Sequence, residues 1–173
     1  AARMTHIVTD LLDFARVGGA RPRFTRVDVG EIVDEVLEDL DGAVVGAGAE
    51  VVVDASTFVR ADDTLLRVLL QNLIANAVKF TVAAGRTPRV FVTVQEMPDG
   101  WRLLVDVNGD AVDPALRDRM FEPMQRGHDA DVQGIGIGLA TCRRIAHAHG
   151  GHIGLDESPA GGTRAWVVLP AAA

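Results

Sequence analysis

The chain has 173 residues, of which 48% are hydrophobic and 24% are charged, and these proportions suit one globular domain with at most a small appendage. The formal net charge is -7 at pH 7 and Lys and Arg do not cluster, so nothing favours nucleic acid as a partner. The single cysteine, Cys142, cannot form an internal disulfide. No apolar run approaches the roughly 18 residues of a membrane span, and no signal peptide is visible, so we expect no membrane contact by this segment.

The first predicted element is a short amphipathic helix that ends at Gly18-Gly19. Its apolar residues are Met4, Ile7, Leu11 and Phe14, spaced three, four and three apart. Fewer than three heptads do not form a convincing coiled coil, so we interpret this helix as one arm of a helical hairpin whose other arm lies upstream. We therefore separate residues 1–22, a hairpin fragment, from residues 23–173, a compact domain.

Residues 24–83 predict alternating strands and helices. A strand at 24–27 precedes a helix at 29–40 with an acidic outer face, a loop of small residues at 42–48, and strands at 50–54 and 58–60. A long helix then begins near Asp62, because Asp62, Asp63 and Thr64 are favourable at a helix N-terminus.

The second half predicts a hairpin followed by a helix and a final pair of strands. Strands at 89–97 and 101–107 flank Pro98-Asp99-Gly100, a strong turn signal. The elements predicted after this hairpin are a short helix at 114–121, a loop at 125–133, a helix from 138 to about 149, and strands at 151–156 and 164–169. His147, His149 and His152 lie around the end of the last helix, and no Cys or acid completes a metal set with them, so we interpret them as helix-end residues.

The long helix carries polar amides where a core helix should have none. Asn72 and Asn76 lie four residues apart on one face, which Lys79 and Phe80 extend by another turn. The rest of the circumference is apolar, so the helix is predicted to be buried. A buried amide without a partner costs about 1 to 3 kcal/mol. Either neighbouring backbone or a ligand must therefore satisfy these two amides.

A glycine-rich segment, Gly-Ile-Gly-Ile-Gly-Leu at 134–139, precedes the last helix. Its backbone N–H groups and the positive end of the helix dipole could hold an anion. It is not a P-loop, because no Gly-Lys-Ser/Thr follows. It is not the dinucleotide fingerprint either, because the last glycine of that motif would fall at Leu139 and its preceding strand is missing. A flexible hinge is the alternative interpretation.

Taken together, five segments resemble the N, G1, F and G2 boxes of the histidine kinase ATP-binding domain in order and spacing. They are residues 72–80, Asn108-Gly109, Phe121-Glu122-Pro123, 134–139 and Gly161-Gly162-Thr163. The resemblance covers nearly the whole chain, since residues 4–19 are similar to the second helix of the dimerisation and phosphotransfer hairpin. It implies an α+β fold, a two-layer α/β sandwich of the GHKL ATPase type in which helices cover one face of a mixed sheet.

The resemblance also implies ATP and Mg²⁺ as ligands and assigns roles position by position. Asn76 would coordinate the Mg²⁺ that bridges the phosphates, with Asn72 supporting it. Lys79 and Arg126 would reach phosphate, which the amides of Gly134, Gly136 and Gly138 would cradle. Further nucleotide-binding candidates are Asn108, Gly109 and Leu139, together with Thr163 at the adenine end.

One box departs from the family pattern. The G1 aspartate that accepts the adenine amino group aligns with Val107, and the second G1 glycine with Ala111. A hydrogen bond to a charged acceptor is worth about 1.5 to 3 kcal/mol, so its loss predicts ATP binding weakened roughly tenfold to over a hundredfold. Asp106 faces the other side of the strand unless a bulge or register slip intervenes, and Asp110 is an alternative from the loop side.

We therefore expect the ATP-binding catalytic core of a two-component sensor histidine kinase. It would transfer the γ-phosphoryl group of ATP to a histidine upstream of this chain, in a homodimer formed through the N-terminal hairpin, with a response regulator as partner. Gyrase-type ATPases carry a glutamate base where Asn72 stands, which favours phosphotransfer over water activation. His6 precedes Ile7 rather than an acid, so the phosphoacceptor is absent from the chain.

Two alternatives remain open. A degenerate kinase module would bind nucleotide poorly or not at all and act as a scaffold for dimerisation and response-regulator docking. A serine kinase of the anti-sigma type has the same fold, but the helix at 4–14 disfavours it. In each case the segment is expected in the cytoplasm, whether or not the full-length protein is attached to a membrane.

Overall fold

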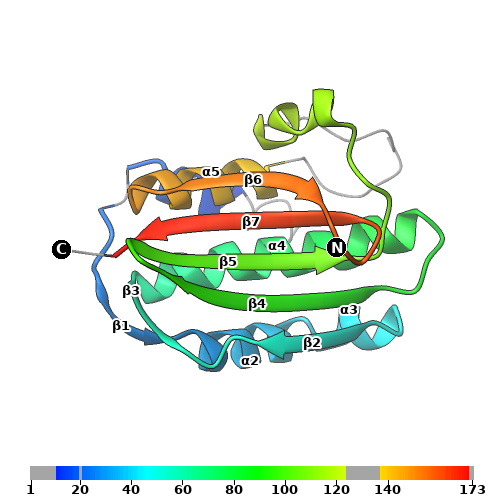
Figure 1. The fold of residues 1–173 in the computed structure, drawn as a ribbon, viewed down its shortest axis with the longest axis horizontal. Helices are drawn as coiled ribbons and strands as arrows, with labels where there is room; N and C mark the ends of the chain where they lie inside the picture. Colours follow the sequence, from blue (N-terminus) through cyan, green and yellow to red (C-terminus); the bar gives the residue numbers. More distant parts are fainter. Residues whose placement is uncertain (1–10, 20, 124–136, 172–173) are drawn as a thin grey trace.

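The computed structural model describes residues 11–19, 21–123 and 137–171 of the chain. Its centre is a five-stranded mixed sheet with the order β2-β4-β5-β7-β6 (Figure 1). The strands are β2 (Glu50–Asp54), β4 (Arg89–Met97), β5 (Gly100–Val107), β6 (His152–Glu157) and β7 (Thr163–Pro170). The β2–β4 pair is parallel and the other pairs are antiparallel. The predicted two-layer α/β sandwich with a mixed sheet is confirmed.

Three helices form the second layer: α2 (Val29–Asp39), α4 (Asp63–Ala83) and α5 (Gly138–Ala148), all on one face of the sheet (Figure 1). The predicted start of the long helix is confirmed, since the Asp62 carboxylate accepts the N–H of Leu65 at 3.0 Å. Beside this layer, β1 (Thr25–Asp28) and β3 (Phe58–Ala61) form a separate antiparallel pair.

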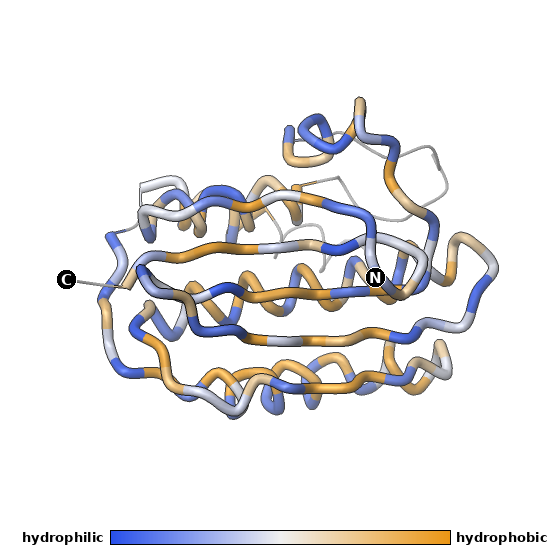
Figure 2. The backbone as a smooth tube through the Cα atoms, in the orientation of Figure 1, coloured by the Kyte–Doolittle hydropathy of each residue, from blue (hydrophilic) through white to orange (hydrophobic). Residues whose placement is uncertain are grey.

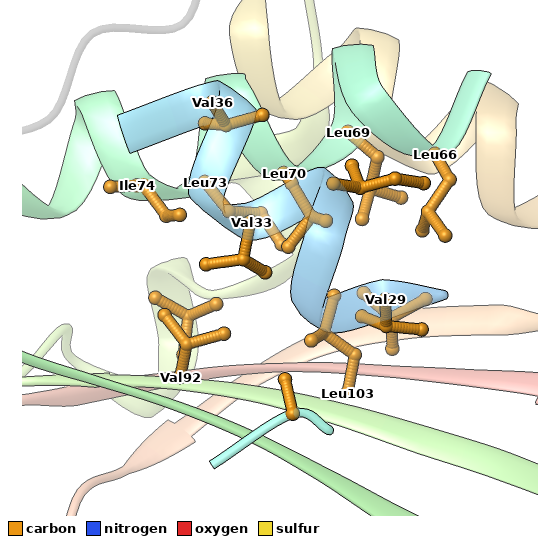
Figure 3. Close-up of a cluster of buried hydrophobic side chains, with 14 of the residues drawn as sticks. Val29, Val33, Val36, Leu66, Leu69, Leu70, Leu73, Ile74, Val92 and Leu103 are labelled. Carbon is orange, nitrogen blue, oxygen red and sulfur yellow. The ribbon is translucent and has the colours of Figure 1, made fainter. Parts of the chain in front are cut away.

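The core lies between the helices and the sheet. Figure 3 shows Val33 of α2, Leu70 of α4 and Val92 and Leu103 of the sheet pointing into one cluster, and all four side chains are fully buried. Along the tube in Figure 2, hydrophobic residues concentrate in the strands and α4, whereas the loops are mostly hydrophilic. Full burial of a side chain of this size contributes about 1.5 to 3 kcal/mol, so this layer supplies much of the stability of the fold.

Helix α4 is the central element of the helical layer. By length and composition it is the one helix in the described part of the chain that could cross a membrane, with a mean hydropathy of 1.3. It packs against α2, α5 and β5, and Leu66, Leu69 and Leu70 are fully buried there. The core helix of a folded domain has this composition, and the packing identifies α4 as such a helix.

The predicted loop at 42–48 is wrong, because the structure has a short helix, α3 (Asp41–Gly46), in this segment. The carbonyl of Leu40, which ends α2, accepts the N–H of Val44 at 2.9 Å and so begins a new helical turn. Gly48, with φ 63°, then turns the chain out of the helix. Local hydrogen bonding thus overrides the low helix propensity of the glycines.

The predicted short helix at 114–121 is two consecutive 3-10 helices, η1 (Pro114–Leu116) and η2 (Asp118–Phe121). The Asp113 carboxylate accepts the N–H of Ala115 at the start of η1. Phe121, of the predicted F box, is buried, and the guanidinium of Arg143 on α5 lies 5.4 Å from its ring centroid. The F box therefore packs against the helix that follows the glycine-rich segment.

The N-terminal helix contacts the helical layer at its C-terminal end. Residues 11–17 are helical, and Val17 is buried in the main core. The Arg144 side chain on α5 donates to the Phe14 carbonyl at 3.1 Å, and its guanidinium lies 3.6 Å from the Phe14 ring centroid. Leu11 of the predicted seam is 48% exposed. Met4, His6 and Ile7 lie outside the described residues.

Candidate functional site

A cavity of about 200 Å³ lies at the end of the sheet where β5 ends and the β6–β7 turn meets the C-terminal half of α4. Figure 1 shows the end of β5, the turn between β6 and β7 and the end of α4 gathered at one edge of the molecule. The cavity lining is mostly apolar and includes Leu73, Ala77, Val105, Val107, Met120 and Leu155. Such a lining suits a flat, weakly polar ring.

The predicted site residues converge on this cavity from four segments. Asn76, Gly109, Leu139 and Thr163 line it, and Asn72 and Gly138 lie beside Asn76. Asn108 and Lys79 are not among its lining residues. Arg126, Gly134 and Gly136, and the predicted loop residue His128, lie outside the described residues.

The two amides of α4 face the start of α5. A Cβ atom on Gly138 would lie 3.1 Å from Asn72 Oδ1 and 3.3 Å from Asn76 Nδ2, so only a glycine lets the helix start come this close without displacing the amides. Asn72 Nδ2 donates to the Val68 carbonyl at 3.0 Å. This bond within α4 leaves Asn72 Oδ1 facing Gly138. It also provides a hydrogen-bond partner for the Asn72 NH₂ group.

The chemistry of this corner fits a hydrated divalent cation bound next to phosphate. Magnesium prefers oxygen donors and keeps several waters, so the amide oxygens of Asn72 and Asn76 suffice as protein ligands beside phosphate oxygens. Among the described residues, no side chain caps the N-terminus of α5, which begins at Gly138. A helix start of this kind suits an anion, because its first backbone N–H groups and its dipole favour negative charge.

Lys79 lies one turn beyond Asn76, and its side chain is exposed. Phe80, the next residue, lines the cavity. Thr81 was not predicted as a site residue but is fully buried, lines the cavity, and donates its hydroxyl proton to the Ala77 carbonyl at 2.7 Å. No pattern in the sequence distinguishes this threonine from a core residue.

At the opposite end of the cavity, the side chains of strand β5 alternate between the two faces of the sheet up to the last residue. Its antiparallel register with β4 runs without a bulge from Met97↔Gly100 to Val90↔Val107. Val107 therefore faces the cavity, and the preceding residue, Asp106, faces the other side of the sheet. The bulge or register slip that would have brought Asp106 into the cavity is absent from this strand.

Asp106 instead holds a polar cluster on the far face. Its carboxylate accepts from Arg164 Nε and from Ser158 Oγ, each at 2.8 Å. The hydrogen bond that Arg164 donates to Asp106 raises the pKa of Arg164 above its ordinary value. Because Ser158 directly follows β6 and Arg164 is the second residue of β7, Asp106 contacts both sides of the β6–β7 turn and fixes its position.

Asp110, the other candidate for an adenine acceptor, lies at the rim of the cavity. Its side chain is 72% exposed, and its carboxylate lies 3.3 Å from the guanidinium of Arg86. The Asp110 carbonyl accepts the hydroxyl proton of Thr163 at 3.0 Å. The carboxylate is thus directed towards solvent and Arg86.

Arg86 is a supporting residue that the sequence did not reveal. Its Nη1 donates to the carbonyls of Gly109 at 2.8 Å and Asn108 at 3.2 Å, so it holds the segment that follows β5. The Asn108 side chain accepts from the N–H of Arg89 and donates to the Thr87 carbonyl, which fixes the same segment from the other side. Asn108 therefore shapes the cavity wall by anchoring backbone.

The Gly161-Gly162-Thr163 segment meets the Asn108-Gly109 segment directly. A Cβ atom on Gly162 would lie 2.2 Å from the Val107 carbonyl oxygen, a contact that no side chain tolerates. Gly161 has φ 95°, a backbone conformation that favours glycine. Close backbone approach therefore explains Gly162, and the positive φ explains Gly161.

The prediction of a helix-end role is confirmed for His149. Its Nδ1 lies 2.8 Å from the Ile145 carbonyl, and since a carbonyl can only accept, Nδ1 carries the proton. Nε2 accepts the N–H of Asp62 at 3.1 Å, at the N-terminus of α4. His149 thus joins the end of α5 to the start of α4, far from the cavity.

A mixed sheet covered by helices on one face, with two amides and a glycine helix start beside an apolar cavity, defines a nucleotide-binding domain of the ATPase type. Comparison with known proteins agrees with this class. Residues 61–173 match the family described as histidine kinase-, DNA gyrase B-, and HSP90-like ATPase. The chain belongs to this family, as a catalytic domain of the sensor histidine kinase type.

Among similar proteins, the phytochrome-like protein Cph1 of Synechocystis is 34% identical over 96% of this chain, which spans 22% of the length of Cph1. The crystal structure of full-length ShkA in complex with AMPPNP is 30% identical, with a TM-score of 0.77, over 98% of this chain and 37% of that one. The histidine kinase ThkA in complex with the response regulator protein TrrA has the same fold, with 23% identity and a TM-score of 0.75 over 99% of this chain and 48% of that one.

Proposed function

We propose that this domain binds ATP with Mg²⁺ and presents the γ-phosphoryl group to a histidine on a helix upstream of residues 1–22. The observation that carries the proposal is the convergence of Asn72, Asn76 and Gly138 next to an apolar cavity of about 200 Å³. One end of this arrangement suits charged phosphate and a cation, and the other suits an aromatic ring.

In this proposal each group has a defined task. The amide oxygens of Asn72 and Asn76 hold a magnesium ion, which when bound neutralises phosphate charge. The N–H groups at the start of α5 hold the phosphates, and Lys79 adds a positive charge near them. Arg126, Gly134 and Gly136 are proposed to complete the phosphate contacts. Phosphoryl transfer depends mainly on such positioning and electrostatics, so the domain needs no covalent participant of its own.

Transfer to a histidine is favoured over hydrolysis by the composition of the cavity. Among the described lining residues, Asp110 alone carries an acid or imidazole group, and it is exposed at the rim and paired with Arg86. A general base must lie within hydrogen-bonding reach of the water that it activates. Asn72, at the position of the glutamate base of gyrase-type ATPases, cannot take a proton.

We further propose that residues 1–22 belong to a dimerisation and phosphotransfer hairpin and that residues 23–173 form the ATP-binding domain. The exposure of Leu11 supports the hairpin assignment, since this apolar residue of the predicted seam is free to contact another helix, whereas Val17 packs on the domain. The proposed assembly is a homodimer on the cytoplasmic side of the cell that passes phosphate to a response regulator. The ThkA complex with TrrA shows such a partner for a relative in fold.

The decisive test is a calorimetric titration of the chain with ATP in the presence of Mg²⁺ and, as a control, in the presence of EDTA. Binding in the micromolar range that weakens on chelation supports the proposal. Absence of binding at millimolar ATP would contradict it. Transfer itself is measured on a longer chain that includes the upstream helix, with radiolabelled ATP and with its phosphoacceptor histidine replaced by glutamine as the control.

We propose in addition that nucleotide affinity is lowered by Val107. A charged acceptor contributes about 1.5 to 3 kcal/mol, so restoring it in Val107→Asp should tighten ATP binding about tenfold to a hundredfold. A variant that bound no better would show that Val107 does not face the adenine amino group. If wild type and variant both fail to bind, the second candidate function is favoured, a scaffold for dimerisation and response-regulator docking.

A further inference from the structure

The end of the cavity near Val107 offers no charged acceptor to a bound ring. Among the described cavity-lining residues Asp110 alone has a carboxylate, which is exposed and paired with Arg86. Asp106 faces the other side of the sheet and is held there by Arg164 and Ser158. Within the described residues, a ring that lies against Val107 therefore meets no carboxylate.

The polar groups that do line this end are two hydroxyls. Thr81 donates its proton to the Ala77 carbonyl at 2.7 Å, and Thr163 donates its proton to the Asp110 carbonyl at 3.0 Å. With both protons committed, each oxygen presents only lone pairs to a ligand. A neutral hydroxyl lone pair accepts from the amino group of adenine or, after a small shift of the ring, from the N1–H of a 6-oxo purine, and unlike a carboxylate it carries no negative charge to repel the 6-oxo oxygen strongly.

The remaining contacts at this end are apolar. Val107 is 8% exposed, and its neighbours in the cavity wall include Val105, Ala111 and Leu155. Apolar walls discriminate poorly between isosteric ligands, whereas a site that hydrogen-bonds a defined group rejects an analogue lacking it by large factors. The cavity therefore holds a purine ring by shape and burial and does not read position 6.

We infer that this site accepts purine nucleoside triphosphates without selecting the 6-amino group, so that hypoxanthine and adenine nucleotides bind with similar affinity. Val107 is the residue that sets this lack of selectivity. The inference rests on the proposed nucleotide binding at Asn72, Asn76 and Gly138. It extends that proposal from ATP to the class of 6-amino and 6-oxo purine nucleotides.

The experiment compares calorimetric titrations of the wild-type chain with ATP and with inosine 5′-triphosphate, each with Mg²⁺. The expected ratio of dissociation constants lies within about threefold of unity, since no group in the cavity distinguishes the two rings. ATP bound about tenfold tighter or more would overturn the inference and leave the proposed function intact. Absence of binding by both nucleotides would overturn the proposed function, and the inference with it.

Two nearly isosteric variants make the test sharper. In Val107→Asp the carboxylate accepts from the adenine amino group and repels a 6-oxo oxygen, so ATP should become preferred by about tenfold to a hundredfold. In Val107→Asn the amide can present either its oxygen or its NH₂ group, so the ratio should stay close to that of the wild type.

Selectivity that is unchanged in folded Val107→Asp would overturn the assignment of Val107. Thermal melts of both variants establish whether they fold, because Val107 is nearly buried. If Val107→Asp does not fold, the wild-type ratio of the two nucleotides decides the matter alone.

Discussion

The two ends of the cavity differ in the polar groups that they present to a ligand. At one end, Asn72, Asn76 and the glycine start of α5 present amide oxygens and N–H groups suited to a cation and phosphate. At the other, Val107 and its neighbours present apolar surface, and the nearest carboxylates point elsewhere. In the proposed function, binding would depend on the end that holds phosphate, whereas the inferred lack of selectivity would come from the ring end, where no described lining residue directs a carboxylate at the ring.

The cavity wall near Val107 has an apolar surface, yet polar residues hold it in position. The wall near Val107 is fixed by many bonds, including those of Arg86, Asn108 and Thr163 to neighbouring backbone. Its apolar surface is thus held in place by polar residues directed away from the cavity. A fixed wall keeps the entropic cost of ordering low when a ring binds, which partly offsets a missing hydrogen bond.

The largest expected effect is at the phosphate end. Asn76→Ala removes the proposed metal ligand and should weaken ATP binding in the presence of Mg²⁺ by about a hundredfold or more, while binding in EDTA changes little. Calorimetry with and without the metal measures this difference. The control is Gln71→Ala, which removes an amide of α4 outside the cavity lining. Equal losses in the two variants would contradict a metal role for Asn76.

A large effect is also expected where the β6–β7 turn touches the end of β5. Gly162→Ala places a Cβ atom against the Val107 carbonyl and should lower the free energy of unfolding by about 1 to 3 kcal/mol. Thermal and urea unfolding measure this change. Gly42→Ala is the matched control, because a Cβ there meets nothing within 4 Å. Equal stability of the two variants would show that the close approach is not required.

A smaller effect on nucleotide binding is expected from Arg86, the clamp that holds the Asn108-Gly109 segment through hydrogen bonds to its carbonyls. Arg86→Met leaves two carbonyls without their donor, and the loss of about 1 kcal/mol should weaken nucleotide binding about fivefold. Calorimetry with ATP measures the effect. Arg102→Met, which removes an exposed arginine bonded to Gln95, should leave affinity unchanged. An identical affinity in Arg86→Met would indicate that the segment holds its position without the clamp.

The smallest expected effect on nucleotide binding belongs to Asp106. Asp106→Asn should change the dissociation constant for ATP by less than about twofold, because this side chain faces away from the cavity, while the free energy of unfolding falls by about 1 to 3 kcal/mol. Titration and urea unfolding of the same sample test both parts. A tenfold or greater loss of affinity in a fully folded variant would show that Asp106 takes part in binding the adenine base.

Much of the fold followed from local patterns. The alternation of strands 89–97 and 101–107, the Asp62 cap and the amide stripe on α4 are properties of short segments, and the structure confirms them. The prediction of a loop of small residues at 42–48 was wrong, because backbone hydrogen bonds, such as the one from the Val44 N–H to the Leu40 carbonyl, outweighed the composition of the segment. Propensity is a weak guide over six residues, where a few hydrogen bonds decide the conformation.

By itself, the sequence determined which segments form the layers and indicated Asn76 and Thr163 among the residues that line the cavity, because helical and strand periodicities and the motif spacing are encoded locally. The tertiary structure alone decided the use of the residues that lie between motifs. Arg86 and Thr81 belong to no pattern, and their roles arise from backbone carbonyls that the fold brings within reach. It also decided the orientation of Asp106, since an unbroken register and bonds to Arg164 and Ser158 hold it on the far face of the sheet.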